Sequence, residues 1–195
     1  MSRSWFARLV GALGCKVVAV SDIAGGGYAG RGLSIVAVQE HAAYAGTVAG
    51  SPGTEPISNR ELLELDVDVL VPAALSRVVN STNANAVRAP VILEAANHPV
   101  SFAADQVLAD RGITVIPDIL ANAGGVTVSY FEWTQNLQQF RWDEKRVNSE
   151  LHKTMSAAWQ RVHERADRDN VSLRLAAFAT AVETVATAAP PPGHT

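Results

Sequence analysis

Short β-branched runs that alternate with helical patterns constrain the fold of this chain more than any other feature. The expected strands are Lys16–Ser21, Val67–Val71, Val91–Glu94 and Thr114–Ile116. Such apolar runs are typical of parallel strands that are buried on both faces. Parallel neighbours need long crossover connections, and helical patterns fill the intervals here. We therefore predict an α/β fold with a Rossmann-like, doubly wound and mostly parallel sheet.

The pattern becomes purely helical after Trp142. Asp143 is expected to cap one long helix, and Ser172 starts a last one. Elsewhere, Ser58 with Glu61 forms a capping box, and Ser101 caps a further helix. Two apolar stripes are expected to face inward: Val147, Leu151, Met155, Trp159 and Val162, then Leu175, Phe178, Val182 and Val185. We predict a nucleotide-binding domain over residues 1–142, packed helices over 143–189 and a disordered tail over 190–195.

An acidic residue, Asp22, ends the first predicted strand. A helix, a glycine, a strand and a terminal acid form the second half of a Rossmann βαβ unit, in which the acid binds a ribose. The glycine fingerprint should precede that acid by about twenty residues. That position falls at or before Met1, so we expect the sheet to lack its first, central strand. The strands Lys16–Ser21 and Val67–Val71 would then pair directly or leave open edges.

The segment Gly25–Gly30 matches the dinucleotide fingerprint G-x-G-x-x-G letter for letter. Three residues separate it from the preceding strand, however, and no acid follows at the expected interval. A lone match of this kind is a weak signal. We interpret the segment as a flexible glycine-rich loop; its use as a phosphate site is the alternative.

Polar groups follow the last predicted strand in the segment Pro117–Trp133. Gly124 and Gly125 open a helix there, with Asn122 before it and Ser129 within it. In open α/β sheets, ligands bind at the carboxyl ends of the strands. An ordinary strand-to-helix turn explains the spacing equally well.

Composition excludes several classes of protein. The net charge of -3 gives no electrostatic support for binding nucleic acid or an anionic membrane. No apolar run is long enough to span a bilayer. The single cysteine, Cys15, cannot form an internal disulfide, so a cytoplasmic location is expected. The histidines show no ligand spacing, and we expect no metal site.

Six segments together resemble the glutamate dehydrogenase family, which includes leucine, phenylalanine and valine dehydrogenases. They run in one order from Cys15–Asp22 through Gly25–Tyr28, Pro52–Leu75, Glu94–Pro99, Pro117–Gln138 and Ser172–Val185. The resemblance covers only the carboxyl-terminal, coenzyme-binding part of that enzyme. It departs at His98 and Val100, where the family usually has Gly and Thr around Pro99. We interpret His98 as a tolerated loop residue.

The resemblance implies NAD as the coenzyme, with NADP possible. Asp22 would accept a hydrogen bond from the adenosine ribose, and Ala73 and Ala74 would line the coenzyme. Asn97 would contact the nicotinamide-side ribose, and Asn122 would hold the carboxamide or the substrate. A carboxylate at Asp22 would repel a 2′-phosphate and favour NAD.

The resemblance also implies glutamate and 2-oxoglutarate as substrates, interconverted by oxidative deamination. Val126 and Ser129 would line the side-chain pocket, with the Ser129 hydroxyl on the distal carboxylate. The leucine, phenylalanine and valine enzymes have an apolar residue in place of this hydroxyl. A hydroxyl donor at that point favours glutamate over an apolar amino acid.

The family's substrate-binding half, with its catalytic lysine and aspartate, is not matched, so no catalytic residue is expected in this chain. We expect an N-terminally truncated portion of a glutamate dehydrogenase, inactive in isolation, from a family that is usually homohexameric. A non-catalytic nucleotide-binding or subunit-association module is the alternative. A self-sufficient enzyme that uses Gly25–Gly30 for phosphate is a third hypothesis.

Overall fold

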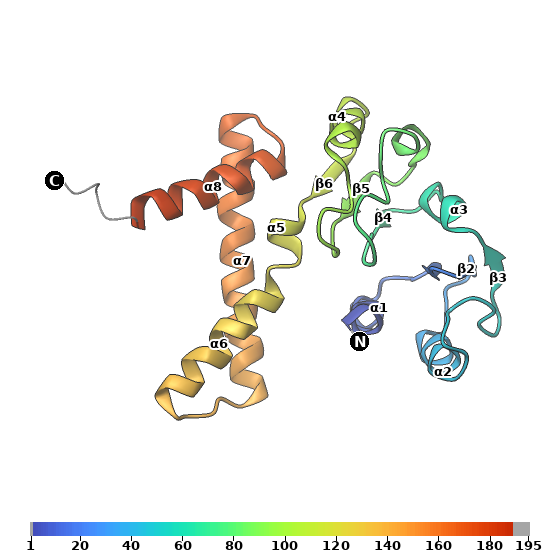
Figure 1. Ribbon diagram of the computed structural model, residues 1–195, viewed down its shortest axis with the longest axis horizontal. Coiled ribbons are helices and arrows are strands. Elements are labelled where there is room, and N and C mark those ends of the chain that lie inside the picture. Colours follow the sequence, from blue (N-terminus) through green and yellow to red (C-terminus); the bar gives the residue numbers. More distant parts are fainter. Residues whose placement is uncertain (1, 189–195) are drawn as a thin grey trace.

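The computed structural model describes residues 2–188, and its strands form two separate three-stranded sheets (Figure 1). The antiparallel sheet has the order β1 (Ala19–Asp22), β2 (Gly25–Tyr28), β3 (Glu55–Ile57). The parallel sheet has the order β4 (Val69–Leu70), β5 (Val91–Leu93), β6 (Thr114–Ile116). The predicted α/β fold, with a parallel sheet and helices at its C-terminal end, is confirmed.

The first strand departs from the prediction of a buried parallel strand over Lys16–Ser21. It begins at Ala19, lies half-buried, and pairs antiparallel with β2 through a hairpin in which Asp22 opposes Gly25. The glycines explain this outcome. Gly26 packs so closely that an added Cβ would collide with the carbonyl oxygen of Val20. A hairpin between adjacent segments therefore satisfies the backbone of β1, and it does so without a crossover.

Most of the glycine-rich segment, Gly25–Tyr28, is thus a strand, and our prediction of a flexible loop over Gly25–Gly30 is wrong for these four residues. Gly26 and Gly27 are buried at its centre. The next helix, α2 (Ile35–Ala45), begins only after Ser34, whose hydroxyl accepts from the Ala37 N–H. The segment therefore does not open a helix in the way a phosphate-binding fingerprint does.

Two further helices accompany the antiparallel sheet. They are α1 (Ser2–Ala12) and the short α3 (Asn59–Leu63). The capping box at the start of α3 is confirmed, because the Ser58 hydroxyl accepts from the Glu61 N–H while the Glu61 carboxylate accepts from the Ser58 N–H. Asn59 then donates through its side-chain amide to the Asp22 carbonyl, which ties α3 to the end of β1.

The parallel sheet carries the larger core. Its central strand, β5, buries Ile92 completely, and α4 (Phe102–Asp110) covers it with Ala104 and Leu108. Ser101 caps α4, as predicted. A 3₁₀ turn, η1 (Ala84–Ala86), packs against α4 and adds Ala84 to the same core. The buried cluster comprises Leu70, Val79, Ala84, Val87, Ala89, Ile92, Val100, Ala104 and Leu108.

Helices occupy the C-terminal end of the molecule, away from the antiparallel sheet (Figure 1). They are α5 (Asp118–Ala121), α6 (Gly124–Gln138), α7 (Glu144–Asp169) and α8 (Leu173–Ala188). Asp143 caps α7, as predicted. α7 and α8 pack together over a second buried cluster formed by Leu120, Val162, Ala166, Ala176 and Ala177.

The predicted inward stripe of α8 is wrong. Leu175, Phe178, Val182 and Val185 are all exposed, whereas Arg174, Ala176 and Ala177 are buried. Small alanine side chains let α8 approach α7 closely, and that approach decides which face is buried. On α7, Val162 is buried as predicted, but Trp159 is exposed.

Within residues 2–188, no single helix is both long and apolar enough to cross a bilayer; only α7 and α8 taken together, bent by 111°, satisfy length and composition. The predicted disordered tail, 190–195, lies outside the described residues.

Candidate functional site

The carboxyl ends of β5 and β6 bring two predicted site residues together. Asn97 follows β5 and Asn122 follows β6, and because these strands are parallel their following loops lie at one edge of the sheet. The side-chain amide of Asn122 donates to Oδ1 of Asn97 over 2.7 Å. The two residues, 25 apart in sequence, therefore form one polar unit.

This asparagine pair keeps hydrogen-bonding capacity for a ligand. The mutual bond uses one N–H of Asn122 and one lone pair of Asn97, so the Asn97 amide group and the Asn122 carbonyl keep donors and an acceptor. Asn97 is exposed and Asn122 is half-buried. A donor beside an acceptor is the complement of a carboxamide or of a sugar hydroxyl.

The predicted alanines lie at the same edge of the sheet, in the segment that follows β4. Ala73 is half-buried and Ala74 is exposed. The carbonyl of the preceding Pro72 accepts from the N–H groups of Ala95 and Ala96, at 3.1 and 2.9 Å. The segment after β4 is thereby fixed beside the segment after β5 that carries Asn97.

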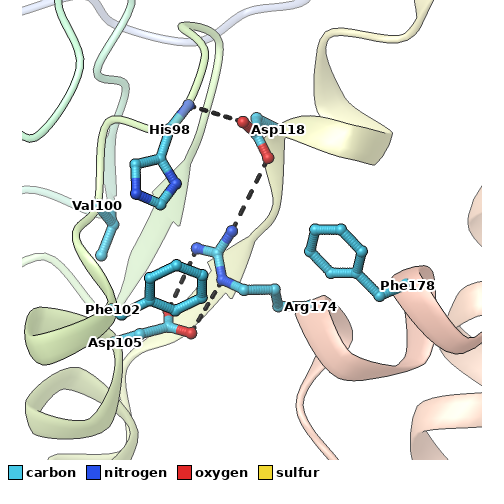
Figure 2. A pocket seen from close by; sticks show the side chains of 7 residues that line it. All are labelled: His98, Val100, Phe102, Asp105, Asp118, Arg174 and Phe178. Atoms are coloured by element: carbon cyan, nitrogen blue, oxygen red, sulfur yellow. Dashed lines mark hydrogen bonds and ion pairs between the residues drawn. The ribbon is translucent and has the colours of Figure 1, made fainter.

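A buried ionic group joins the loops that carry the asparagine pair to helix α8; Figure 2 shows three of its members, Asp105, Asp118 and Arg174. Glu94 is 0% exposed and Arg174, from α8, is 9% exposed. Nη1 and Nη2 of Arg174 donate to the two oxygens of Glu94 over 3.0 and 2.9 Å. Nε and Nη2 also donate to Asp105, over 2.9 and 3.2 Å. Burial lowers the pKa of Arg174, but the hydrogen bonds to Glu94 and Asp105 outweigh it and raise the pKa above its ordinary value.

The same ionic group holds the loops after β5 and β6. Glu94 accepts from the N–H of Asp118 over 2.8 Å and from the N–H of Val100 over 3.3 Å. Asp118 accepts in turn from the N–H of His98 over 2.7 Å, and its Oδ1 lies 3.8 Å from Arg174 Nη1. Sequence reasoning missed this group. A glutamate closing an apolar strand and a single arginine in an alanine-rich helix were the available signals.

A small cavity adjoins the ionic group. Its volume is about 80 Å³, and it is lined by His98, Val100, Phe102, Asp105, Asp118, Arg174 and Phe178 (Figure 2). The rings of His98 and Phe102 lie 5.3 Å apart. Pockets for small-molecule ligands usually measure about 300–1,000 Å³, so this one is too small for a dinucleotide.

His98 adopts a backbone conformation that favours glycine. Its φ is 49°, in the left-handed region. A glycine at this position in related proteins would adopt it without strain. The structure thus gives a physical reason for the family's preference that His98 departs from.

Asp22 lies in the other sheet, where its carboxylate is already hydrogen-bonded. It accepts from the N–H groups of Ala24 and Val48 over 2.8 and 2.7 Å, and from the Thr47 hydroxyl over 3.0 Å. Burial raises the pKa of Asp22, but these three hydrogen bonds together lower it below its ordinary value. Oδ2 accepts only the Val48 bond among those described, so a lone pair there stays open to a donor.

Val126 and Ser129 both lie on the solvent side of α6. Val126 is 76% exposed, and Ser129 is exposed with its hydroxyl donating to the Gly125 carbonyl over 3.1 Å. They follow Asn122 in the chain, in the first turns of α6. Their roles toward a substrate side chain stay predictions.

Residues 2–188 contain no group of three or more His, Cys, Asp or Glu side chains arranged to hold a metal ion.

Known proteins match nearly the whole chain. The profile of the Glutamate/Leucine/Phenylalanine/Valine dehydrogenase family matches residues 4–193. A glutamate dehydrogenase from Thermotoga maritima is 49% identical over 174 residues, which are 89% of this chain and 42% of that protein. The chain therefore spans less than half the length of this relative.

Solved structures that are similar to this chain include glutamate dehydrogenases as well. A hetero-hexameric glutamate dehydrogenase from Thermus thermophilus superposes with a TM-score of 0.90 at 31% identity, covering 98% of this chain and 45% of that one. A glutamate dehydrogenase from Peptoniphilus asaccharolyticus gives 0.79 at 30% identity, covering 95% and 43%. Because the family profile extends over almost every residue, the chain belongs to the Glutamate/Leucine/Phenylalanine/Valine dehydrogenase family.

Proposed function

We propose that this chain is the coenzyme-binding portion of an NAD(P)-dependent glutamate dehydrogenase, an enzyme that deaminates glutamate oxidatively to 2-oxoglutarate and ammonia. The observation that carries the proposal is the asparagine pair, Asn97 with Asn122, at the carboxyl ends of two parallel strands. Ligands of open α/β sheets bind at that edge. The relatives named glutamate dehydrogenase support the choice of reaction.

The residues at this edge suit the nicotinamide end of the coenzyme. Asn97 presents amide donors to a ribose hydroxyl, and Asn122 presents its carbonyl to a carboxamide. The small side chain of Ala73 leaves room for a ring beside them. Bound there, the coenzyme would supply a hydride acceptor; the chain's own contribution is to orient the ring and keep its face toward the substrate.

Asp22 suits the adenosine end. Its pKa is lowered, so it carries a full charge at neutral pH. An ionised carboxylate with an open lone pair accepts a hydrogen bond from a ribose hydroxyl and repels a 2′-phosphate. We therefore propose NAD rather than NADP as the preferred coenzyme.

Val126 and Ser129 are proposed to line the pocket for the substrate side chain. The Ser129 hydroxyl, freed from the Gly125 carbonyl by a rotation of its side chain, would donate to the distal carboxylate of glutamate. An apolar amino acid would leave that hydroxyl without a partner, which favours glutamate.

We propose that this chain alone does not deaminate glutamate. The segments at the carboxyl edge, 94–100 and 117–129, contain no lysine. The reacting lysine and aspartate of the intact enzyme would come from its other half. In the intact enzyme, which in this family is usually a homohexamer, that half would complete the site.

Isothermal titration calorimetry with NAD tests the proposal. We expect the purified chain to bind NAD, and expect Asn97→Ala and Asn122→Ala each to weaken binding roughly fivefold, about the value of one hydrogen bond. Asn148→Ala, at an exposed position of α7, is the matched control and should bind like the wild type. Absence of binding to both NAD and NADP would contradict the proposal.

Subunit association is a second candidate function, because a relative with a TM-score of 0.90 is a hetero-hexamer. Analytical ultracentrifugation of the chain mixed with a full-length glutamate dehydrogenase subunit tests it. Co-sedimentation without NAD binding would favour this candidate over the first.

A further inference from the structure

We propose that Arg174 is a positioning residue, which holds the loops after β5 and β6 so that Asn97 and Asn122 stay paired toward a ligand. The inference rests on the proposed function, because it assumes that the asparagine pair binds the nicotinamide end of the coenzyme. It assigns a role in that site to the C-terminal helix α8, which carries Arg174.

One carboxylate joins α8 to both loops. The two carboxylate oxygens of Glu94 accept hydrogen bonds from both terminal nitrogens of Arg174. The same oxygens accept hydrogen bonds from the backbone N–H groups of Val100 and Asp118. Val100 ends the loop after β5, and Asp118 begins the segment after β6. A shift of Glu94 would therefore move both loops at once.

Both asparagines lie close to these attachment points. Asn97 lies between Glu94 and His98, whose N–H is bound by Asp118 over 2.7 Å. Asn122 donates its backbone N–H to the Asp118 carbonyl over 3.0 Å. The loop that carries Asn97 and the turn that carries Asn122 thus share Asp118, which lies 3.8 Å from Arg174.

α8 also packs through residues other than this arginine. Ala176 and Ala177 already pack α8 into the second buried cluster. Arg174 instead donates hydrogen bonds to Glu94 and Asp105, and both of these residues belong to the parallel-sheet region. A planar guanidinium can bridge two carboxylates in this way, whereas an ammonium acts as a point charge.

The test compares Arg174→Gln and Arg174→Lys with the control Arg165→Gln. Arg165 joins α7 to α8 through Glu183 and also pairs with Asp169 on its own helix; these described bonds involve neither loop, so we expect its removal to weaken helix packing alone. Two readouts are used: the side-chain amide ¹H–¹⁵N signals of Asn97 and Asn122, and the affinities for NAD and for ADP. ADP lacks the nicotinamide and its ribose and reports only the adenosine end.

We expect Arg174→Gln to shift both amide signals and to weaken NAD binding roughly fivefold, about one hydrogen bond, while ADP binding stays unchanged. Arg174→Lys should lie between the glutamine variant and the wild type. Arg165→Gln should leave the signals and the NAD-to-ADP affinity ratio unchanged. Should the glutamine variant fail to fold, the lysine variant decides, by the same two readouts.

Unchanged amide signals in the Arg174 variants would overturn the inference, as would an unchanged NAD-to-ADP ratio in a chain that binds NAD. A wild type that binds neither NAD nor NADP would overturn the proposed function instead. In that case the amide signals alone would decide whether Arg174 positions the pair.

Discussion

The two sheets of this molecule have equal numbers of strands but are stabilised differently. The parallel sheet surrounds a buried cluster in which Ile92, Val79 and Leu108 are 0% exposed. In the antiparallel sheet every residue of β1 is only half-buried, and the centre of β2 is glycine. Side-chain packing defines the first sheet, whereas close backbone approach and local hydrogen bonds define the second.

The difference in packing between the two sheets explains why one predicted parallel strand forms and another does not. Val91–Leu93 pairs with β4 on one side and β6 on the other, and its central residue, Ile92, packs in a buried cluster with Ala104 and Leu108 of α4. Ala19–Asp22 has a glycine-rich segment directly after it, and a hairpin forms with the nearest available partner. Whether an apolar run pairs in a parallel or an antiparallel sheet depends on the segments next to it and not on its own composition.

The largest expected effect separates the two sheets. Ile92→Ala should lower the free energy of unfolding by about 2–5 kcal/mol, because it opens a cavity in the parallel-sheet core. Amide hydrogen exchange should accelerate in β5, β6 and α4 and stay unchanged in β1–β3. Val38→Ala, at the buried position of α2, is the control and should have a smaller effect. Equal acceleration in both sheets would show that they unfold as one cooperative unit.

A smaller effect is expected in the antiparallel sheet from added volume. Gly26→Ala should destabilise the chain by about 1–3 kcal/mol, because the new methyl group would collide with the backbone of Val20. Chemical denaturation monitored by circular dichroism measures the change. Gly11→Ala in α1 meets no atom within 4 Å and should be neutral or slightly stabilising. A neutral Gly26→Ala variant would contradict the close approach of β1 and β2.

The smallest expected effect is on the pH dependence of the free energy of unfolding. The pKa of Asp22 in the folded chain lies below its ordinary value of 3.8, so its carboxylate stabilises the fold above that pH. This contribution is lost as the pH falls through the lowered pKa. Asp22→Asn should therefore be less stable at neutral pH and lose less stability on acidification. Unfolding free energies measured between about pH 6 and about pH 2 should converge for the two proteins; a constant difference would contradict the assignment.

Local signals predicted the helices well. Ser58, Ser101 and Asp143 each cap a helix where a short polar side chain precedes a helical pattern. Capping depends on residues within one turn, so sequence alone determines it. The face of α8 was predicted wrongly because two stripes compete there, and close packing against α7 selected the alanines over the larger apolar side chains.

The site was predictable only where it depends on local sequence and on strand topology. Asn97 and Asn122 could be placed at strand ends, and parallel topology brings such ends together. Glu94 and Arg174 could not be paired, because 80 residues separate them and no periodicity links them. Asp22 could be located, but its hydrogen bonds to Thr47 and Val48 depend on a distant turn.

The separation between Glu94 and Arg174 also bears on the order in which the chain matures during synthesis. Glu94 emerges from the ribosome 80 residues before the arginine that neutralises it. Until then, burying its carboxylate at the end of β5 would leave an uncompensated charge, which costs several kcal/mol. The edge of the parallel sheet that carries the asparagine pair can therefore close only after Arg174 has been translated.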